Sequence, residues 1–179
     1  SIWRNFPTIR NERWSHGNMV LVGDAAHTAH FSVGSGTKLA MEDSIALVDA
    51  FKAVGTGDVP RALETYEESR RIDVLKTQRA AQTSLEWFEN SRRYLGQHPL
   101  EFTFNLMTRS RQITYDNLAK RDPELVRKVT RWWWDERGLP RASDGSAPPP
   151  MFAPFRLREL ELENRVVVSP MCQYSAVDG

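Results

Sequence analysis

The residues with the clearest capacity for chemistry lie in one stretch near the amino terminus. A short apolar run at 19–22 leads into Gly23 and Asp24, and Gly34 and Gly36 then open a helix-like segment. A carboxylate at the carboxyl end of a buried strand can accept hydrogen bonds from ligand hydroxyls, and a glycine-rich helix start offers free N–H groups and a positive dipole. This arrangement suits a large polar cofactor. The alternative, of equal weight, is that Asp24 only caps its own turn.

The elements around this stretch follow from apolar spacing. The wholly apolar run 19–22 predicts a strand buried on both faces. A helix is predicted from about Thr37 to Phe51, with Met41, Ile45 and Val48 in one apolar stripe. Because other apolar residues occupy much of the remaining surface, we expect this helix to be mostly buried.

The middle of the chain is predicted to be helical. Asp58 is the expected N-cap of a helical pattern at 61–96, with Pro60 in its first turn. A continuous helix there would exceed about 50 Å, so we expect a break or bend. Further helices are predicted over 100–118 and from 123 to the tryptophans. The apolar face of the 61–96 pattern contains Leu63, Tyr66, Ile72, Leu75, Ala81, Leu85 and Phe88.

The best domain boundary is the proline-rich segment 141–150, which has no large apolar residue to anchor a core. We therefore divide the chain into 1–140, a linker at 141–150, and a second α/β domain that starts at 151–179. The β-branched run 165–169 predicts a buried strand in that second domain. The three tryptophans at 132–134 cannot all face one core, so at least one should pack on another domain or remain exposed.

Composition limits the partners. The chain has 24 Lys plus Arg against 23 Asp plus Glu, which gives no global reason to expect nucleic acid or an anionic membrane. Cys172 is the single cysteine, so an intrachain disulfide is excluded and a reducing, cytoplasmic compartment is expected. No window is apolar enough for a membrane span. The absence of an initiator Met, and an end just after a strand-like run, predict a piece of something longer.

Residues 20–27, followed by 34–36 and 42–44, resemble the second flavin-binding motif of the single-component flavoprotein aromatic hydroxylases. The resemblance implies FAD, oxygen and NAD(P)H as electron donor. It also implies that Asp24 bonds the ribityl chain and that 34–37 lies near the pyrimidine end of the flavin ring. The predicted FAD-binding residues are Gly23, Asp24, Gly34, Ser35, Gly36 and Thr37.

Two features depart from this family or are missing from the chain. His30 and Phe31 stand where most members have two prolines, and His30 is our candidate for a residue near the reacting ring. The other flavin signature, Gly-x-Gly-x-x-Gly after a first strand, is absent. Under the resemblance, the amino-terminal half of the FAD domain therefore lies upstream.

Beyond the linker, residues 152–155 and 164–175 resemble the start of an old yellow enzyme, a TIM-barrel protein that binds FMN. The resemblance implies that residues 169–172 contact FMN and that Tyr174 reaches the substrate pocket. For Cys172 alone, a buried small hydrophobe is the alternative. The fold class is therefore α/β, with the mainly helical carboxyl-terminal part of an FAD-binding monooxygenase domain followed by the first strand of a TIM barrel. The predicted FMN contacts are Ser169, Pro170, Met171 and Cys172.

A hydroxylase joined to an old yellow enzyme resembles the bifunctional flavoproteins that hydroxylate and then reduce CoA-activated aromatic acids such as 2-aminobenzoyl-CoA. The alternative is a single-activity enzyme similar to the salicylyl-CoA 5-hydroxylases. Residues 92–131 contain seven Arg and two Lys against four acidic residues, and arginine suits the phosphates of CoA. Arg109 and Arg111 are the candidate substrate-binding residues, and an ordinary solvated helical face is the alternative. Self-association as a homo-oligomer stays open.

Three rival hypotheses remain. His27 and His30 are three apart, but no cysteine or carboxylate pair completes a ligand set, and we predict no metal site. Asp24, His27 and Ser32 contain the ingredients of a hydrolase triad without a nucleophile elbow. Residues 61–134 could instead form a flavin-free interaction scaffold. The flavin hypothesis predicts a cofactor-sized groove beside Asp24 and Gly36, whereas the scaffold hypothesis predicts a filled core there.

Overall fold

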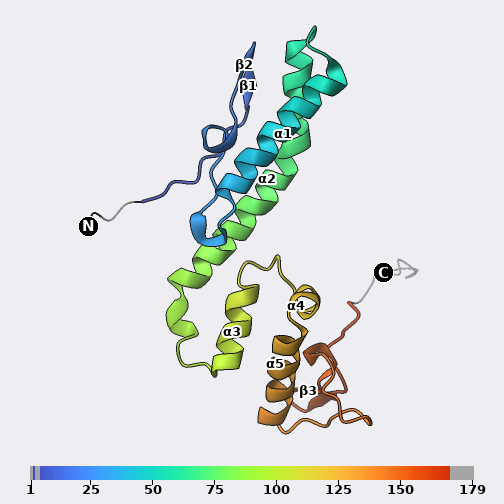
Figure 1. The fold of residues 1–179 in the computed structure, drawn as a ribbon. Helices are drawn as coiled ribbons and strands as arrows, with labels where there is room; N and C mark the ends of the chain where they lie inside the picture. Colours follow the sequence, from blue (N-terminus) through green and yellow to red (C-terminus); the bar gives the residue numbers. More distant parts are fainter. Residues whose placement is uncertain (1, 3–4, 170–179) are drawn as a thin grey trace, which may run out of the picture. The chain divides into compact units, whose positions relative to one another are not determined.

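The computed structural model describes residues 2 and 5–169, and its main elements are helices (Figure 1). The chain forms two compact units. The first contains the described residues of 1–97 and 105–114, and the second those of 98–104 and 115–179. Within the part of the chain that the structure describes, no helix is long and apolar enough to cross a membrane.

Two long helices form the framework of the first unit. Helices α1 (Gly36–Val54) and α2 (Val59–Glu89) lie side by side in Figure 1. The predicted cap is confirmed, because the Asp58 side chain accepts a hydrogen bond from the backbone N–H of Arg61. Helix α2 is continuous for 31 residues. The break that we expected within 61–96 follows Glu89, where α2 ends and residues 91–93 form a 3-10 turn.

The expectation that the first helix would be mostly buried is wrong. Helix α1 turns Leu39, Asp43 and Ala50 inward, whereas Met41 and Ile45 of the predicted stripe are 63% and 61% exposed. The reason is that α1 packs against α2 on one side, so only one face is covered. Apolar spacing alone could not tell which of two apolar faces would meet that partner.

The apolar face expected on α2 is only partly correct. Leu63, Tyr66 and Ala81 are buried as predicted, but Ile72 and Phe88 are 62% and 44% exposed. Polar side chains replace the missing members: the buried residues of α2 also include Arg70, Gln78 and Ser84. The hydrophobic core of the unit consists of Trp14, Ala26, Leu39, Ala50, Tyr66 and Val74.

The predicted strand at 19–22 is shorter and more exposed than expected. Strand β2 (Met19–Val20) pairs antiparallel with β1 (Ser15–His16) in a two-residue hairpin. Met19 is 65% exposed and Leu21 is 38% exposed. A strand is buried on both faces only inside a larger sheet, and β1 is its one neighbour among the described residues.

The helices that follow are shorter than the sequence suggested. The predicted helix at 100–118 is divided into α3 (Pro99–Thr108) and α4 (Tyr115–Arg121). The division occurs where Arg111 adopts a positive φ of 60°, a conformation that a right-handed helix cannot contain. Helix α5 (Pro123–Glu136) begins where predicted.

The three consecutive tryptophans of α5 have different surroundings, as their spacing required. All three lie within the second unit, and each has its own partner. The Trp132 ring stacks on His98, Trp133 lies under Arg137 and Arg165, and the Trp134 indole donates to the Pro148 carbonyl at 2.7 Å.

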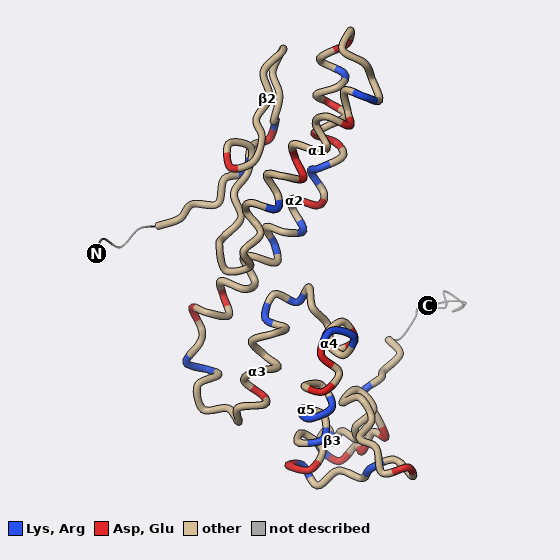
Figure 2. Tube along the Cα trace, viewed as in Figure 1, with Lys and Arg blue, Asp and Glu red and all other residues tan. Residues whose placement is uncertain are grey.

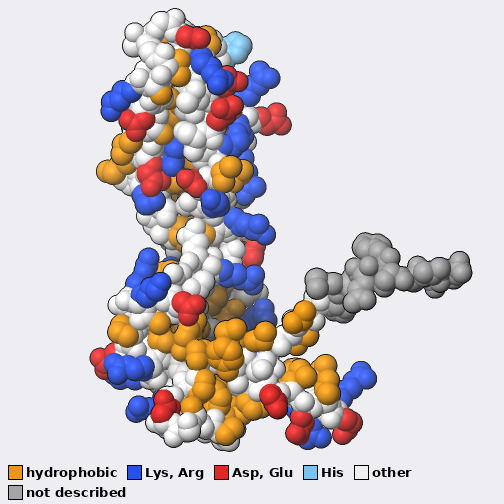
Figure 3. Space-filling view, turned by 90° about the vertical axis from the view of Figure 1, so that its right-hand side faces the viewer, with side chains coloured by type: hydrophobic (Ala, Val, Ile, Leu, Met, Phe, Trp, Pro, Cys, Tyr) orange, Lys and Arg blue, Asp and Glu red, His pale blue; other side chains and the backbone are white. Residues whose placement is uncertain are grey.

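The segment beyond the proline-rich stretch forms a small hairpin. Strands β3 (Phe155–Leu157) and β4 (Leu160–Leu162) pair antiparallel. The strand predicted at 165–169, the first of a TIM barrel, is not formed. Val167 and Val168 are 72% and 82% exposed, and Figure 3 shows hydrophobic side chains just before the grey trace. A β-branched run needs neighbouring strands to become a buried strand, and no described strand pairs with it.

Candidate cofactor site

An open cavity of about 880 Å³ lies in the first unit, beside the residues that the sequence singled out. Gly23 and Asp24 line it together with Gly34, Gly36 and Thr37. The size is within the range of small-molecule and cofactor sites. The scaffold hypothesis predicted a filled core at this position, so the cavity favours the cofactor hypothesis.

The amino terminus of α1 opens onto this cavity. Gly34 adopts the left-handed conformation with φ of 65°, which redirects the chain into the helix. The Ser35 side chain makes no capping bond, and the first helical bond runs from Leu39 N–H to the Ser35 carbonyl. Among the described residues, the N–H groups of Gly36 and Thr37 therefore have no acceptor. They provide donors and the positive end of the helix dipole to a ligand.

Asp24 lies on a 3-10 turn (Gly23–Ala25) and is exposed. The turn is closed by backbone bonds alone, from Ala26 N–H and His27 N–H to the Gly23 carbonyl. The Asp24 carboxylate accepts no hydrogen bond from any described residue, so it does not cap its own turn. It remains available to a ligand that carries hydroxyl groups.

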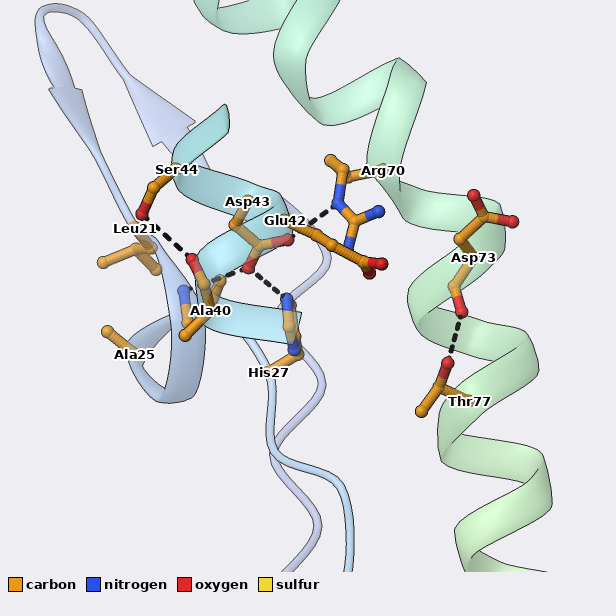
Figure 4. Close-up of polar contacts among 12 residues, drawn as sticks. Leu21, Ala25, His27, Ala40, Glu42, Asp43, Ser44, Arg70, Asp73 and Thr77 are labelled. Atoms are coloured by element: carbon orange, nitrogen blue, oxygen red, sulfur yellow. Dashed lines mark hydrogen bonds and ion pairs between the residues drawn. The ribbon is translucent and has the colours of Figure 1, made fainter. Parts of the chain in front are cut away.

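A buried charge network fixes the turn that carries Asp24. The Asp43 carboxylate accepts from Gly23 N–H at 3.1 Å, from His27 Nε2 at 2.7 Å and from Arg70 Nε at 2.9 Å. Figure 4 shows the side chains of Asp43 on α1, Arg70 on α2 and His27, from the segment that precedes α1, converging. Asp43 is fully buried, and His27 and Arg70 are 2% and 7% exposed. The network connects α1 and α2 with Gly23, which lines the cavity.

The electrostatics of this network follow from its geometry. Burial alone would raise the pKa of Asp43, but hydrogen bonds from His27, Arg70 and Gly23 outweigh burial and lower that pKa. Because Asp43 is an ionised acceptor, His27 donates through Nε2. The His27 Nδ1 atom is buried without a hydrogen-bond partner among the described residues.

Sequence reasoning missed this network. Asp43 enters the sequence analysis only within the segment 42–44 of the flavin motif, and Arg70 is not singled out. The usable signal is positional: Asp43 stands four residues after Leu39 and seven before Ala50, on the apolar face that the helix buries. Arg70 likewise stands between Tyr66 and Val74 on the buried face of α2. A charged residue on a buried helical face predicts a charged partner.

His30 lines the cavity but also has a structural role. Its Nδ1 accepts from Ser32 N–H at 3.2 Å, and its ring lies against Phe31 with centroids 4.2 Å apart. The proposed triad is not assembled, because His27 pairs with Asp43 and the Ser32 hydroxyl donates to a backbone carbonyl of α2. No group of three metal-binding side chains occurs among the residues described here.

The remaining predicted site residues fall elsewhere. The Arg109 side chain donates to the Ser84 hydroxyl and to the backbone carbonyls of Leu106 and Ser32. Arg111 is exposed. Ser169 is exposed at the end of the described chain. The other predicted flavin and substrate contacts of this segment, Pro170, Met171, Cys172 and Tyr174, lie outside the described residues.

Comparison with known proteins gives the cavity its context. Residues 2–81 match the family model described as the FAD binding domain. This segment contains the whole cavity lining and all three members of the buried network. The flavin motif and the geometry therefore fall within the same matched segment.

Among curated proteins, the salicyloyl-CoA 5-hydroxylase of a Streptomyces species is 44% identical over 181 residues, covering 100% of this chain and 33% of its own length. The 3-hydroxy-4-methyl-anthranilyl-[aryl-carrier protein] 5-monooxygenase of Streptosporangium sibiricum is 46% identical over 123 residues, covering 66% of this chain and 32% of its own length. The protodeoxyviolaceinate monooxygenase of Chromobacterium violaceum is 43% identical over 89 residues, covering 49% of this chain and 23% of its own length. The chain thus spans about a third or less of these relatives.

Proposed function

We propose that this chain is part of an FAD-dependent monooxygenase that hydroxylates the ring of an aromatic acid held as a CoA thioester. One observation carries the proposal. A cavity in the segment matching the FAD binding domain is lined both by the Asp24 carboxylate and by the first N–H groups of α1, none of which has a partner among the described residues. A carboxylate acceptor and backbone N–H donors that line one cavity suit a cofactor with both hydroxyl groups and an electron-rich ring.

The residues present fit FAD. Asp24 would accept hydrogen bonds from the ribityl hydroxyls, and the backbone of 34–37 would donate to the pyrimidine end of the flavin ring. Phe6 and Phe31, whose rings meet edge to face with centroids 5.4 Å apart, give the cavity an apolar side. When bound, FAD supplies the redox and oxygen-activating chemistry, with NAD(P)H as the proposed electron donor.

The protein contributes electrostatics and position. The amino-terminal end of α1 stabilises negative charge that develops beside it, and its N–H groups are already oriented by the helix. The Asp43 network holds the Asp24 turn without using the Asp24 carboxylate. His30 Nδ1 already accepts from Ser32 N–H, so this side chain presents Nε2–H to the cavity as a hydrogen-bond donor.

The substrate class is inferred from the relatives. Two of them are named for aromatic acyl groups attached to a carrier, CoA in one case and a carrier protein in the other. The salicyloyl-CoA relative aligns with the whole chain, including 151–179, and is named for hydroxylation alone. This supports a single-activity monooxygenase over the bifunctional enzyme. FMN at residues 169–172 and a second, reductive step stay predictions that the flavin analysis below tests.

The first test is flavin extraction from the purified polypeptide that carries this chain. We expect FAD, and we expect Asp24→Ala to lower the bound fraction, because ribityl hydroxyls lose their acceptor. Asp49→Ala is the matched control, since Asp49 is an exposed carboxylate of α1 outside the cavity. Absence of flavin after reconstitution would overturn the proposal, and FMN beside FAD would restore the bifunctional hypothesis.

The second test concerns the substrate. The FAD-loaded protein is supplied with NADH or NADPH, oxygen, and either salicyloyl-CoA or 2-aminobenzoyl-CoA, and products are identified by mass. Hydroxylation of a CoA thioester, without turnover of the free acid, is the expected result. Equal turnover of the free acid would reject the thioester assignment. A product with a reduced ring would show the second activity.

A further inference from the structure

A second cavity in the first unit, of about 360 Å³, has an unusual concentration of positive charge. It lies where the end of α2 and the segment after α3 meet, and Arg93, Arg109 and Arg111 all line it. Figure 2, which draws Lys and Arg in blue, shows basic positions in both segments. We call it the arginine cavity. It shares no residue with the cavity beside Asp24.

Arg109 is the fixed member of this cavity. It donates to the Ser84 hydroxyl at 3.0 Å and to the carbonyls of Leu106 and Ser32 at 2.7 and 2.9 Å. Its guanidinium also lies 5.2 Å from the ring centroid of Phe88. All of these partners are neutral. A half-buried cation with neutral partners keeps its full charge, and these bonds use only three of its five N–H groups.

Arg93 and Arg111 are the adaptable members. Both are exposed, and among the described residues none of the three cavity arginines forms an ion pair with a carboxylate. Within the described part of the chain, Glu86 is the only acidic residue that lines the cavity, and Gln82 donates to it at 3.2 Å. Three cations against one carboxylate leave the cavity with a net positive charge of two.

The same cavity has an aromatic wall. The rings of Trp87 and Tyr94 stack with centroids 4.7 Å apart and an interplanar angle of 16°, and both residues line the cavity. Guanidinium groups bind phosphate oxygens, and an aromatic side chain beside them can contact the base of a phosphorylated nucleoside.

We propose that the arginine cavity binds the phosphorylated adenosine end of the CoA thioester. This inference rests on the proposed function for the substrate class, but not on flavin binding or turnover. The phosphates at the 3′ and 5′ positions of that adenosine meet Arg93, Arg109 and Arg111. The cavity therefore binds the CoA part of the substrate rather than its aromatic ring.

The test is calorimetric binding of adenosine 3′,5′-bisphosphate to the full 179-residue chain. The test variant is Arg93→Gln/Arg111→Gln, which removes two charges without disturbing the hydrogen bonds of Arg109. The matched control is Arg92→Gln, an exposed neighbour of equal charge that does not line the cavity. We expect the test variant to bind roughly 10- to 100-fold more weakly, and the control to bind like the unmodified chain. Binding should also weaken with salt.

Two further probes separate the sources of phosphate. Adenosine 2′,5′-bisphosphate represents the phosphorylated end of NADPH, and inorganic phosphate represents any anion. Equal or tighter binding of either probe would overturn the CoA assignment, as would absence of binding or an unchanged test variant. If the double variant does not fold, Arg93→Gln alone serves, because no described residue bonds that side chain. Loss of hydroxylase activity with intact nucleotide binding would instead count against the proposed function only.

Discussion

Replacement of Arg70 by methionine leaves the buried Asp43 carboxylate without its arginine partner. The variant keeps most of the aliphatic stem but removes the donors to Asp43 and to Glu42, which Arg70 contacts at 2.9 and 3.1 Å. Removing one partner of a buried pair costs about 3–5 kcal/mol, because a charge is left without compensation. Asp43 keeps its bonds from Gly23 and His27. We therefore expect the free energy of unfolding to fall by about 3 kcal/mol, the lower end of that range.

The assay is the free energy of unfolding in urea, measured for the 179-residue chain. Arg61→Met is the control, because it removes an arginine from the same helix whose partner, Glu64, is exposed. The free energy of unfolding should fall much less in Arg61→Met than in Arg70→Met. The double variant Asp43→Asn/Arg70→Met should be more stable than Arg70→Met alone, since the uncompensated charge is gone. Equal losses for Arg70→Met and Arg61→Met, or no recovery in the double variant, would refute the reasoning.

Two other predictions concern Gly23 and Asp43, which share a hydrogen bond. Gly23→Ala should lower the melting temperature, because Gly23 has φ of 61° and an added Cβ would lie 3.1 Å from the Ala40 Cβ; Gly57→Ala, which meets nothing within 4 Å, should not. The folded pKa of Asp43 is below its ordinary value of 3.8, so its ionisation stabilises the fold above that value and this contribution is lost as the pH falls through the folded pKa. Urea titrations should show a steeper loss of stability below about pH 4 than in Asp43→Asn, and identical acid profiles would contradict the assignment.

Local signals determined much of the helical half from sequence. The Asp58 cap, the helix beginning near Thr37 and the start of α5 at Pro123 depend on interactions within a few residues, so they could be predicted without knowledge of the partners. The motif around Asp24 and Gly34 also placed a cofactor-sized cavity correctly, because a turn and a helix start adjacent in sequence remain adjacent in space.

Interactions between distant residues were decided by the tertiary structure. Which face of α1 is buried depended on α2, and the strands predicted at 19–22 and 165–169 lacked the neighbours that would bury them. The Asp43 to Arg70 pair joins positions 27 residues apart on two helices. Sequence spacing shows that each charge lies among apolar positions, but only helix packing brings the two together and excludes water from them.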